Sequence, residues 1–204
     1  MPGYLTMWTQ SMGVWVYVLL FAIIFAETGL IVTPFLPGDS LLFAVGALTA
    51  VEGGLNLWLT AVLLIIAAIL GDAVNYSVGR WMGVRIFSRK DSKLFNPQHL
   101  LKAQTFYAKH GGKTIILARF LPIIRTYAPF VAGMSMMNYL SFAIYNVVGA
   151  LVWILSFLVG GHFFGNLPQV KSNFHYVIAA IIILSAMPAI IEVLRARRGA
   201  KLAQ

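Results

Sequence analysis

The sequence predicts an all-α polytopic membrane protein that forms a single membrane domain over residues 1–204. Hydrophobic residues make up 60% of the 204 residues and charged residues only 10%, whereas a soluble domain carries about 25% charged residues. The mean hydropathy is +0.84. Long apolar segments recur along the chain, and most of the fifteen lysines and arginines gather in two clusters outside them. These observations predict four transmembrane spans and two opposed re-entrant hairpins in an inverted-repeat architecture.

Four apolar segments predict complete transmembrane spans, because each approaches the roughly 20 residues that cross about 30 Å of hydrocarbon. These segments are residues 14–32, 57–78, 139–160 and 174–194. The first has no basic residue ahead of it and no obvious cleavage site, so we interpret it as a retained span and not as a secretory signal peptide. The chain has no cysteine, which excludes disulfides and thiolate ligands.

Proline, glycine and charged residues interrupt two further apolar segments, residues 33–50 and 114–135. The interrupting residues include Pro37, Gly38, Asp39, Arg119, Pro122 and Arg125. We predict that both segments are re-entrant hairpins, which membranes tolerate where broken backbone is buried in protein or lines water. A proline-kinked span is the alternative for residues 114–135.

The positive charges set the predicted topology. Eight basic residues lie from Arg80 to Lys113 and four more lie near the end of the chain, and the positive-inside rule assigns both clusters to the cytoplasm. Two full crossings between the clusters keep them on one face, which makes residues 114–135 re-entrant and both termini cytoplasmic. The loop 80–113 is expected to carry an amphipathic helix at the membrane surface, or to be a solvated linker. Neither cluster resembles a nucleic-acid groove.

The two broken segments resemble each other, which suggests an internal repeat. Residues 35–47 read FLPGDSLLFAVGA and residues 120–133 read FLPIIRTYAPFVAG. The halves 1–79 and 114–204 would then each carry one hairpin, and hairpins that enter from opposite faces would meet tip to tip. Opposed broken elements of this kind build midplane binding sites in many transporters.

Five charged residues fall within the predicted membrane segments that precede the last span, namely Glu27, Asp39, Asp72, Arg119 and Arg125. A charge at the bilayer centre costs about 2.5 to 3.5 kcal/mol on insertion scales, so it persists where it is paired, hydrated or functional. One interpretation is a set of structural ion pairs, which are by themselves weak evidence of function. For Asp72 we expect a pair with an arginine or with Asn75.

The segregation of these charges favours a function. The acids lie in the first half of the chain and both arginines in the second. A guanidinium group binds phosphate through a planar fork, and a carboxylate removed from water exchanges protons nearer to neutral pH. We therefore take Arg119 and Arg125 as candidate ligands of a phosphate head group. The three acids, Glu27, Asp39 and Asp72, are candidate proton-coupling residues.

The remaining motifs add little chemistry. Backbone N–H groups around Pro37, Gly38 and Pro122 would be further donors for an anion. We find no motif for a metal or a cofactor and no G-x-S-x-G or H-E-x-x-H motif, so we expect neither a cofactor nor an enzyme. Aromatic residues near the segment ends are expected in an interfacial belt. They are Trp8, Trp15, Tyr17, Trp58, Tyr76, Trp81 and Trp153.

Three motifs resemble the DedA family of bacterial inner-membrane proteins, in particular its namesake branch; the family shares the VTT domain with eukaryotic lipid scramblases. They are FAETGLIVTPFLPGDSLLFAVGAL at 25–48, GDAVNYSVGR at 71–80 and ARFLPIIRTYAPFVAGMSMM at 118–137. The resemblance implies opposed re-entrant hairpins, dependence on the proton-motive force and translocation of undecaprenyl phosphate in lipid-carrier recycling. The family's important acids match Glu27 and Asp39, and its important arginines match Arg119 and Arg125.

We therefore expect a proton-motive-force-dependent transporter of an anionic lipid, undecaprenyl phosphate or a related phospholipid, in the bacterial inner membrane. A proton-coupled antiporter for cations or small amphiphilic compounds is the alternative. The expected partners are an anionic membrane lipid and protons, and not nucleic acid. The sequence leaves open the identity of the lipid, the direction and proton stoichiometry of transport, the acid that titrates and a homo-oligomeric state.

Overall fold

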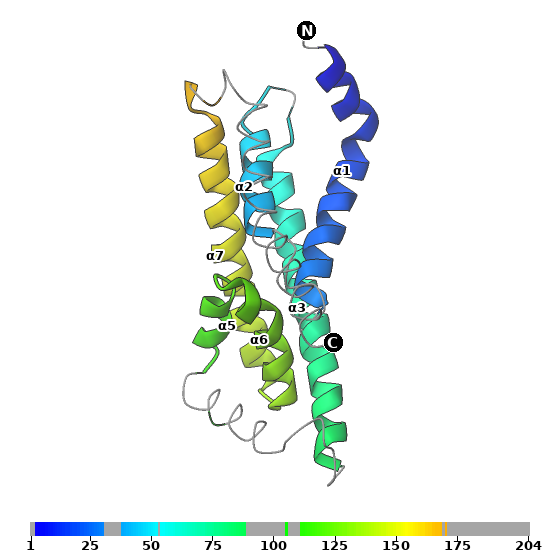
Figure 1. The fold of residues 1–204 in the computed structure, drawn as a ribbon, viewed down its shortest axis with the longest axis vertical. Helices are drawn as coiled ribbons and strands as arrows, with labels where there is room; N and C mark the ends of the chain where they lie inside the picture. The colour runs from blue at the N-terminus through cyan, green and yellow to red at the C-terminus, as the bar shows by residue number, and fades with distance from the viewer. Residues whose placement is uncertain are drawn as a thin grey trace, which may run out of the picture. The chain divides into compact units, whose positions relative to one another are not determined.

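The structure, a computed structural model, describes residues 3–30, 38–52, 54–88, 105, 111–168 and 170. These residues form helices and the turns between them, with no strand among them, as the sequence predicts (Figure 1). The named helices are α1 (Gly3–Gly29), α2 (Gly38–Leu48), α3 (Leu57–Ser88), α5 (Lys113–Ala118), α6 (Pro122–Met134) and α7 (Tyr139–Gly165).

Two of the four predicted spans correspond to helices that are long and apolar enough to cross a membrane. They are Leu57–Met82 within α3 and Tyr139–Gly165, and both begin at the residue that the sequence predicts. The first predicted span corresponds to the second half of α1, which ends at Gly29. The fourth, residues 174–194, lies outside the described residues. The count of four spans therefore stays a prediction.

Exposed apolar side chains follow one face of α3, as a helix against lipid requires. They recur every three or four residues, which is the spacing of a single helix face. They are Leu59, Val62, Ile66, Leu70, Val74 and Val78, each at least 39% exposed. A stripe of this kind is costly in water, so it supports a membrane environment.

The chain divides into two compact units, each assembled from separated segments. Unit 1 consists of Met1–Trp15, Phe35–Ala61 and Leu155–Gln204, and unit 2 of Val16–Pro34 and Val62–Ile154. Helices α1, α3 and α7 contribute to both units. The predicted organisation as a single membrane domain with two repeated halves remains a prediction.

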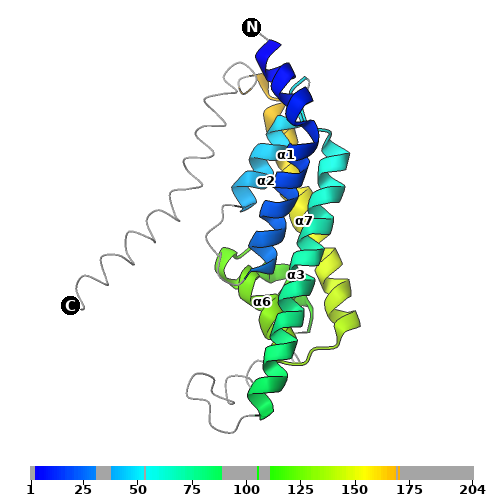
Figure 2. The same cartoon turned by 90° about the vertical axis from the view of Figure 1, so that its right-hand side faces the viewer.

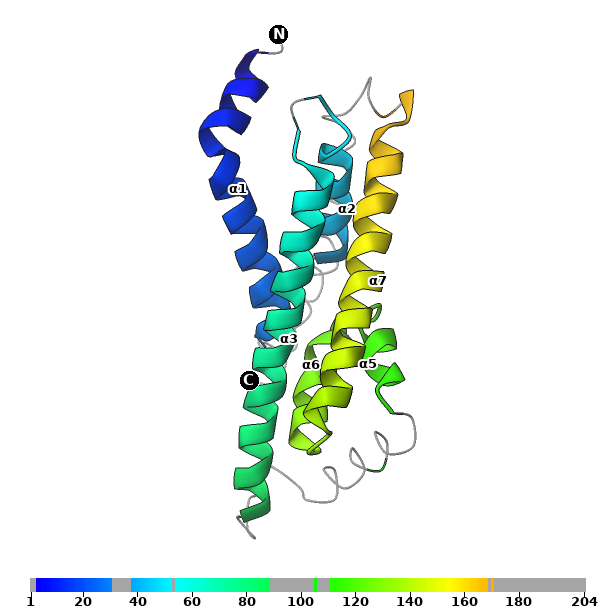
Figure 3. The ribbon, with the colours of Figure 1, turned by 180° about the vertical axis from the view of Figure 1, so that it is seen from behind.

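In unit 1, α2 packs closely against the last turns of α7 (Figure 3). A side chain at Gly46 would overlap the backbone of Leu158, and one at Gly161 would overlap the backbone of Phe43. Glycine is needed at both positions because the two helix backbones approach within a methyl group of each other. The Thr49 hydroxyl also lies 2.8 Å from Nδ1 of His162.

In unit 2, the broken segment 114–135 forms two short helices that lie beside α3 and α7. Helix α5 ends at Ala118, Arg119 caps it, and α6 begins at Pro122. With a rise of 1.5 Å per residue, the six residues of α5 extend about 9 Å and the thirteen of α6 about 20 Å. Neither helix is long enough to cross about 30 Å of hydrocarbon. A helix, a break and a second helix agree with the predicted hairpin, while its entry into a membrane stays a prediction.

Helix α6 lies beside α3 in this unit (Figure 2). A small core holds α6 against its neighbours. Tyr76, Ile115, Ala132 and Phe142 pack together, one from each of four helices. The Tyr76 hydroxyl donates to the backbone oxygen of Met137, in the turn between α6 and α7. The prediction that Tyr76 belongs to an interfacial belt is therefore wrong, because its side chain is 1% exposed and anchors this turn.

Several predicted features fall partly or wholly outside the described residues. Of the first hairpin, residues 33–50, the structure describes α2 and the turn after it. Of the loop 80–113, the structure describes the end of α3 up to Ser88, residue 105 and residues 111–113, and the rest of the expected amphipathic helix lies outside. The basic cluster near the end of the chain also lies outside. The exposed side chains of Trp15, Trp58 and Trp81 agree with positions in an interfacial belt.

Candidate functional site

The last turn of α1 buries Glu27 inside unit 2. Glu27 and Thr28 are both fully buried, and the Thr28 hydroxyl donates to the backbone oxygen of Ile24 at 3.0 Å. The Glu27 carboxylate accepts a hydrogen bond from Nη2 of Arg125 on α6, and the two side chains form an ion pair. Two sequence-predicted site residues, 98 positions apart, are thus brought together.

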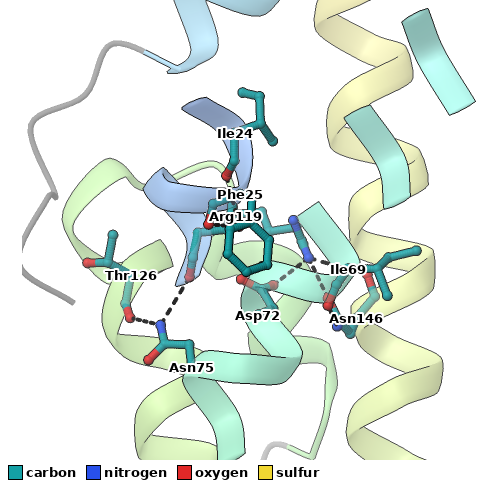
Figure 4. A network of polar contacts seen from close by, with 9 residues as sticks. Ile24, Phe25, Ile69, Asp72, Asn75, Arg119, Thr126 and Asn146 are labelled. Atoms are coloured by element: carbon teal, nitrogen blue, oxygen red, sulfur yellow. Dashed lines mark hydrogen bonds and ion pairs between the residues drawn. The ribbon is translucent and has the colours of Figure 1, made fainter. Parts of the chain in front are cut away.

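A second buried ion pair joins α3 to the break between α5 and α6. Nη2 of Arg119 donates to the Asp72 carboxylate and to the amide oxygen of Asn146 on α7. The Asn146 amide in turn donates to the backbone oxygen of Ile69 at 3.1 Å. Figure 4 shows the Asp72, Arg119 and Asn146 side chains directed toward one another. The expected partner of Asp72 was an arginine or Asn75, and the structure selects the arginine.

Asn75 has a different role, one that the sequence did not predict. Its amide nitrogen donates to the backbone oxygens of Thr28, at 3.2 Å, and Thr126, at 2.7 Å (Figure 4). These two residues directly follow Glu27 and Arg125 in the chain. Asn75 therefore holds together the two backbone segments that carry this ion pair. Its place one helical turn after Asp72, on the same face of α3, is the signal that sequence reasoning could have used.

Trp153 on α7 contacts both guanidinium groups. The Cζ atom of Arg125 lies 4.7 Å from the centre of the indole ring and that of Arg119 lies 5.8 Å from it. The side chain is 0% exposed, so its expected place in an interfacial belt is wrong. Trp153 lies near the middle of the 27-residue α7 and not at its end, which is the sequence signal that was overlooked.

The described cluster has no formal net charge, because two carboxylates pair with two guanidinium groups. Four of its buried polar atoms have no hydrogen-bond partner within the described part of the chain. They are Oδ1 of Asp72, Oδ1 of Asn75, and Nε and Nη1 of Arg119. Buried polar groups are usually hydrogen-bonded, so Arg119 keeps donor capacity that a bound anion or water would satisfy. The site thus combines paired charges with available donors.

The other predicted site residues lie at the starts of helices or outside the residues that the structure describes. Asp39 is half-buried in the first turn of α2, in unit 1, immediately after the buried Gly38. Pro122 is the first residue of α6, and Pro37 lies outside the described residues. The predicted meeting of Asp39 with the arginines concerns the placement of the two units relative to each other, and it stays a prediction. Among the described residues no group of acids and histidines is arranged to hold a metal.

Apolar helices with exposed stripes and buried ion pairs between them define a helical membrane protein. Residues 36–163 match the model of the VTT domain, and the chain belongs to this family, the DedA family. It is 57% identical to protein DedA of Escherichia coli (strain K12), over 92% of this chain and 86% of that protein. It is 41% identical to an uncharacterized membrane protein of Mycobacterium leprae, over 83% and 75%.

A third relative is the inner membrane protein YqjA of Escherichia coli (strain K12), 38% identical over 80% of this chain and 74% of that protein. These relatives are named as membrane proteins or as DedA, and none of the three names is that of an enzyme. Together with the apolar helices, the comparisons place this protein in a membrane. No solved structure matches the chain.

Proposed function

We propose that this protein is a transporter that moves an anionic lipid, undecaprenyl phosphate or a related phospholipid, across the bacterial inner membrane under the proton-motive force. The observation that carries the proposal is the buried pair of guanidinium groups, Arg119 and Arg125, each held by a carboxylate. Arginine binds phosphate through in-plane N–H donors, and Arg119 has two such donor nitrogens without a partner among the described residues.

The neutrality of the cluster links an anion to a proton. A phosphate that entered the site would add negative charge to a buried and formally neutral group of side chains. Buried net charge is costly unless it is compensated. Protonation of Glu27 or Asp72 would restore neutrality and would release its arginine to bind the phosphate. Head-group entry and proton uptake would therefore occur together, one proton for each negative charge.

A lipid suits this arrangement better than a small soluble anion does. The apolar tail of a lipid stays in the hydrocarbon, so only the head group needs a polar path through the protein. The stripe of exposed apolar side chains on α3 gives the tail a compatible surface. The polar cluster in the interior of unit 2 then has to accommodate the head group alone.

The pairing also argues against the alternative, an antiporter for cations or small amphiphilic compounds. An acidic cation site needs carboxylates that can turn toward the cation. In unit 2, Glu27 and Asp72 each bind a guanidinium group, so a cation would have to displace a buried arginine. The pairing therefore favours an anionic substrate.

The test is reconstitution of the purified full-length protein in liposomes of phosphatidylethanolamine and phosphatidylglycerol that contain labelled undecaprenyl phosphate. We expect an imposed pH gradient to change the distribution of the label between the leaflets. The double variant Glu27→Gln with Arg125→Gln keeps the cluster neutral, and we expect it to slow translocation about 10- to 100-fold, the value of one or two charge-assisted hydrogen bonds.

The matched control is Glu52→Gln, a change to an exposed acid in the turn after α2, which should leave translocation unchanged. Unchanged translocation by a normally inserted Arg125→Ala variant would contradict the role of this arginine. Proton-coupled movement of a cation without lipid movement would replace the proposal with the antiporter.

A further inference from the structure

One face of α7 forms a wall of the polar cluster that neither the family resemblance nor the sequence motifs indicate. Asn146, Gly149 and Trp153 are spaced by three and four residues, so they lie on the same side of the helix. Asn146 accepts a hydrogen bond from Arg119. Trp153 presents its indole ring to Arg119 and Arg125. The arginines come from the α5–α6 segment, and α7 provides the surface against which they rest.

Gly149 provides the space that this contact needs. A Cβ atom at this position would lie 2.9 Å from Nε of Arg119 and 3.0 Å from its Cδ. Contacts shorter than about 3.0 Å force one partner to move, and the arginine side chain is the flexible one. The absence of a side chain at Gly149 therefore lets Arg119 lie against α7, within reach of both Asp72 and Asn146.

The indole ring interacts with the guanidinium groups in a way that does not compete with an anion. A cation over an aromatic ring is attracted by the negative electrostatic potential of the ring face. The N–H donors of a guanidinium group lie in its own plane, so they remain available to a carboxylate or a phosphate. The attraction of each guanidinium group to the ring also offsets part of the repulsion between the two cations. Because the indole ring is uncharged, it attracts the two cations without adding charge to the cluster.

We propose that Trp153 is a positioning residue for recognition of the anionic head group. Its ring would hold Arg125, and more weakly Arg119, in place while each guanidinium group exchanges its carboxylate for the phosphate. This inference rests on the proposed function, and it adds a residue that touches the arginines and not the lipid. It predicts that substrate affinity follows the electrostatic potential of the ring and not merely its size.

The experiment varies this potential at nearly constant shape. A full-length protein with the changes Trp8→Phe, Trp15→Phe, Trp58→Phe and Trp81→Phe keeps Trp153 as its sole tryptophan. It is produced with tryptophan that carries zero to four fluorine atoms on the ring. Fluorine progressively removes the negative potential of the ring face. Affinity for undecaprenyl phosphate is measured in phosphatidylethanolamine liposomes. We expect a graded loss that reaches about 30-fold with four fluorines, the effect of a fully desolvated cation–π contact.

The matched control keeps Trp58 as the sole tryptophan and carries Trp153→Phe. Trp58 is 71% exposed and lies on α3 in unit 1. In this protein, fluorination should leave affinity unchanged. A flat series at Trp153 would overturn the proposal. A graded series at both positions would also overturn it, because the effect would then come from general properties of fluorinated protein.

A second measurement separates this inference from the proposed function. If the protein with unmodified tryptophan does not bind undecaprenyl phosphate, the proposed function fails, and the contact is then read from thermal unfolding in detergent. In the protein that retains Arg125, fluorination of Trp153 should lower the unfolding temperature progressively. It should do so less in the neutral double variant Glu27→Gln with Arg125→Gln. Equal slopes in the two backgrounds would show that the ring does not hold Arg125.

Discussion

The two units use short helices for different purposes. In unit 1, the buried positions of α2 are filled by glycine and apolar side chains, and the helix rests on α7 through direct contact of the two backbones. In unit 2, α6 buries Arg125 and Thr126 beside its apolar residues, and both described ion pairs belong to this unit. Segments that start with the same Phe-Leu-Pro sequence are thus built for close packing in one unit and for polar chemistry in the other.

This difference teaches where sensitivity to mutation should lie. The packing of α2 depends on the absence of side-chain volume, which is a steric property. The cluster in unit 2 depends on charge balance, because removal of one partner leaves a buried charge uncompensated. Substitutions of comparable size should therefore have different consequences in the two units.

The largest expected effect is the removal of a single charge from unit 2. Arg119→Gln leaves the Asp72 carboxylate buried without its guanidinium partner, and we expect a loss of about 3 to 5 kcal/mol in the free energy of unfolding. Denaturant titration in detergent micelles measures this loss. The double variant Asp72→Asn with Arg119→Gln should recover most of it, because the cluster is neutral again.

The variant of unit 1 to compare with Arg119→Gln is Asp39→Asn, which also removes one charge. This acid lies in the first turn of α2, where the helix dipole favours a negative charge by about 0.3 to 1 kcal/mol. Losses of equal size for Arg119→Gln and Asp39→Asn would remove the contrast between the two units.

An intermediate effect is expected where unit 1 is tightly packed. Gly46→Ala places a methyl group against the backbone of Leu158, and overpacking of this kind costs about 1 to 3 kcal/mol. The control is Gly13→Ala on α1, where a Cβ atom meets nothing within 4 Å. Thermal unfolding in detergent should show a lower midpoint for the first variant and no decrease for the second. A tolerated Gly46→Ala would mean that α2 is not fixed against α7.

Among the three main substitutions, the smallest expected effect is that of Asn75, whose amide joins two backbone segments in unit 2. Asn75→Ala removes two hydrogen bonds, to Thr28 and Thr126, for which we expect a loss of about 1 to 2 kcal/mol. Asn166→Ala in unit 1 removes an exposed amide that contacts His162, and we expect a change within about 0.5 kcal/mol. Unfolding of the two variants under identical conditions checks the difference, and an equal response would contradict the bridging role of Asn75.

Much of the helical framework could be predicted from the sequence. Helices α3 and α7 begin at the predicted residues Leu57 and Tyr139, because the turn residues and the apolar segment that follows them are local signals. The break in the segment 114–135 follows from Pro122, whose fixed backbone starts α6. The ionisable residues of the membrane segments were also recognisable, because such residues are rare in apolar sequence.

The partners within the site could not be predicted in the same way. Glu27 and Arg125 are 98 residues apart, and Asp72 and Arg119 are 47 residues apart. The sequence indicates that acids and arginines require partners, but it does not state which acid lies beside which arginine. The roles of Trp153 and Asn75 were missed for a related reason, because each acts on residues of other helices, and the sequence does not show which helix faces meet.

The sequence by itself determined that this chain forms apolar helices, that the segment 114–135 is broken, and that a few charges in the apolar segments need partners. Hydropathy, proline and charge act on neighbouring residues, so they can be read along the chain. Only the tertiary structure decided that Glu27 binds Arg125, that Asp72 binds Arg119, and that an indole ring contacts both arginines. These pairings depend on which helix faces meet, and that is decided by the packing of segments that are far apart in the sequence.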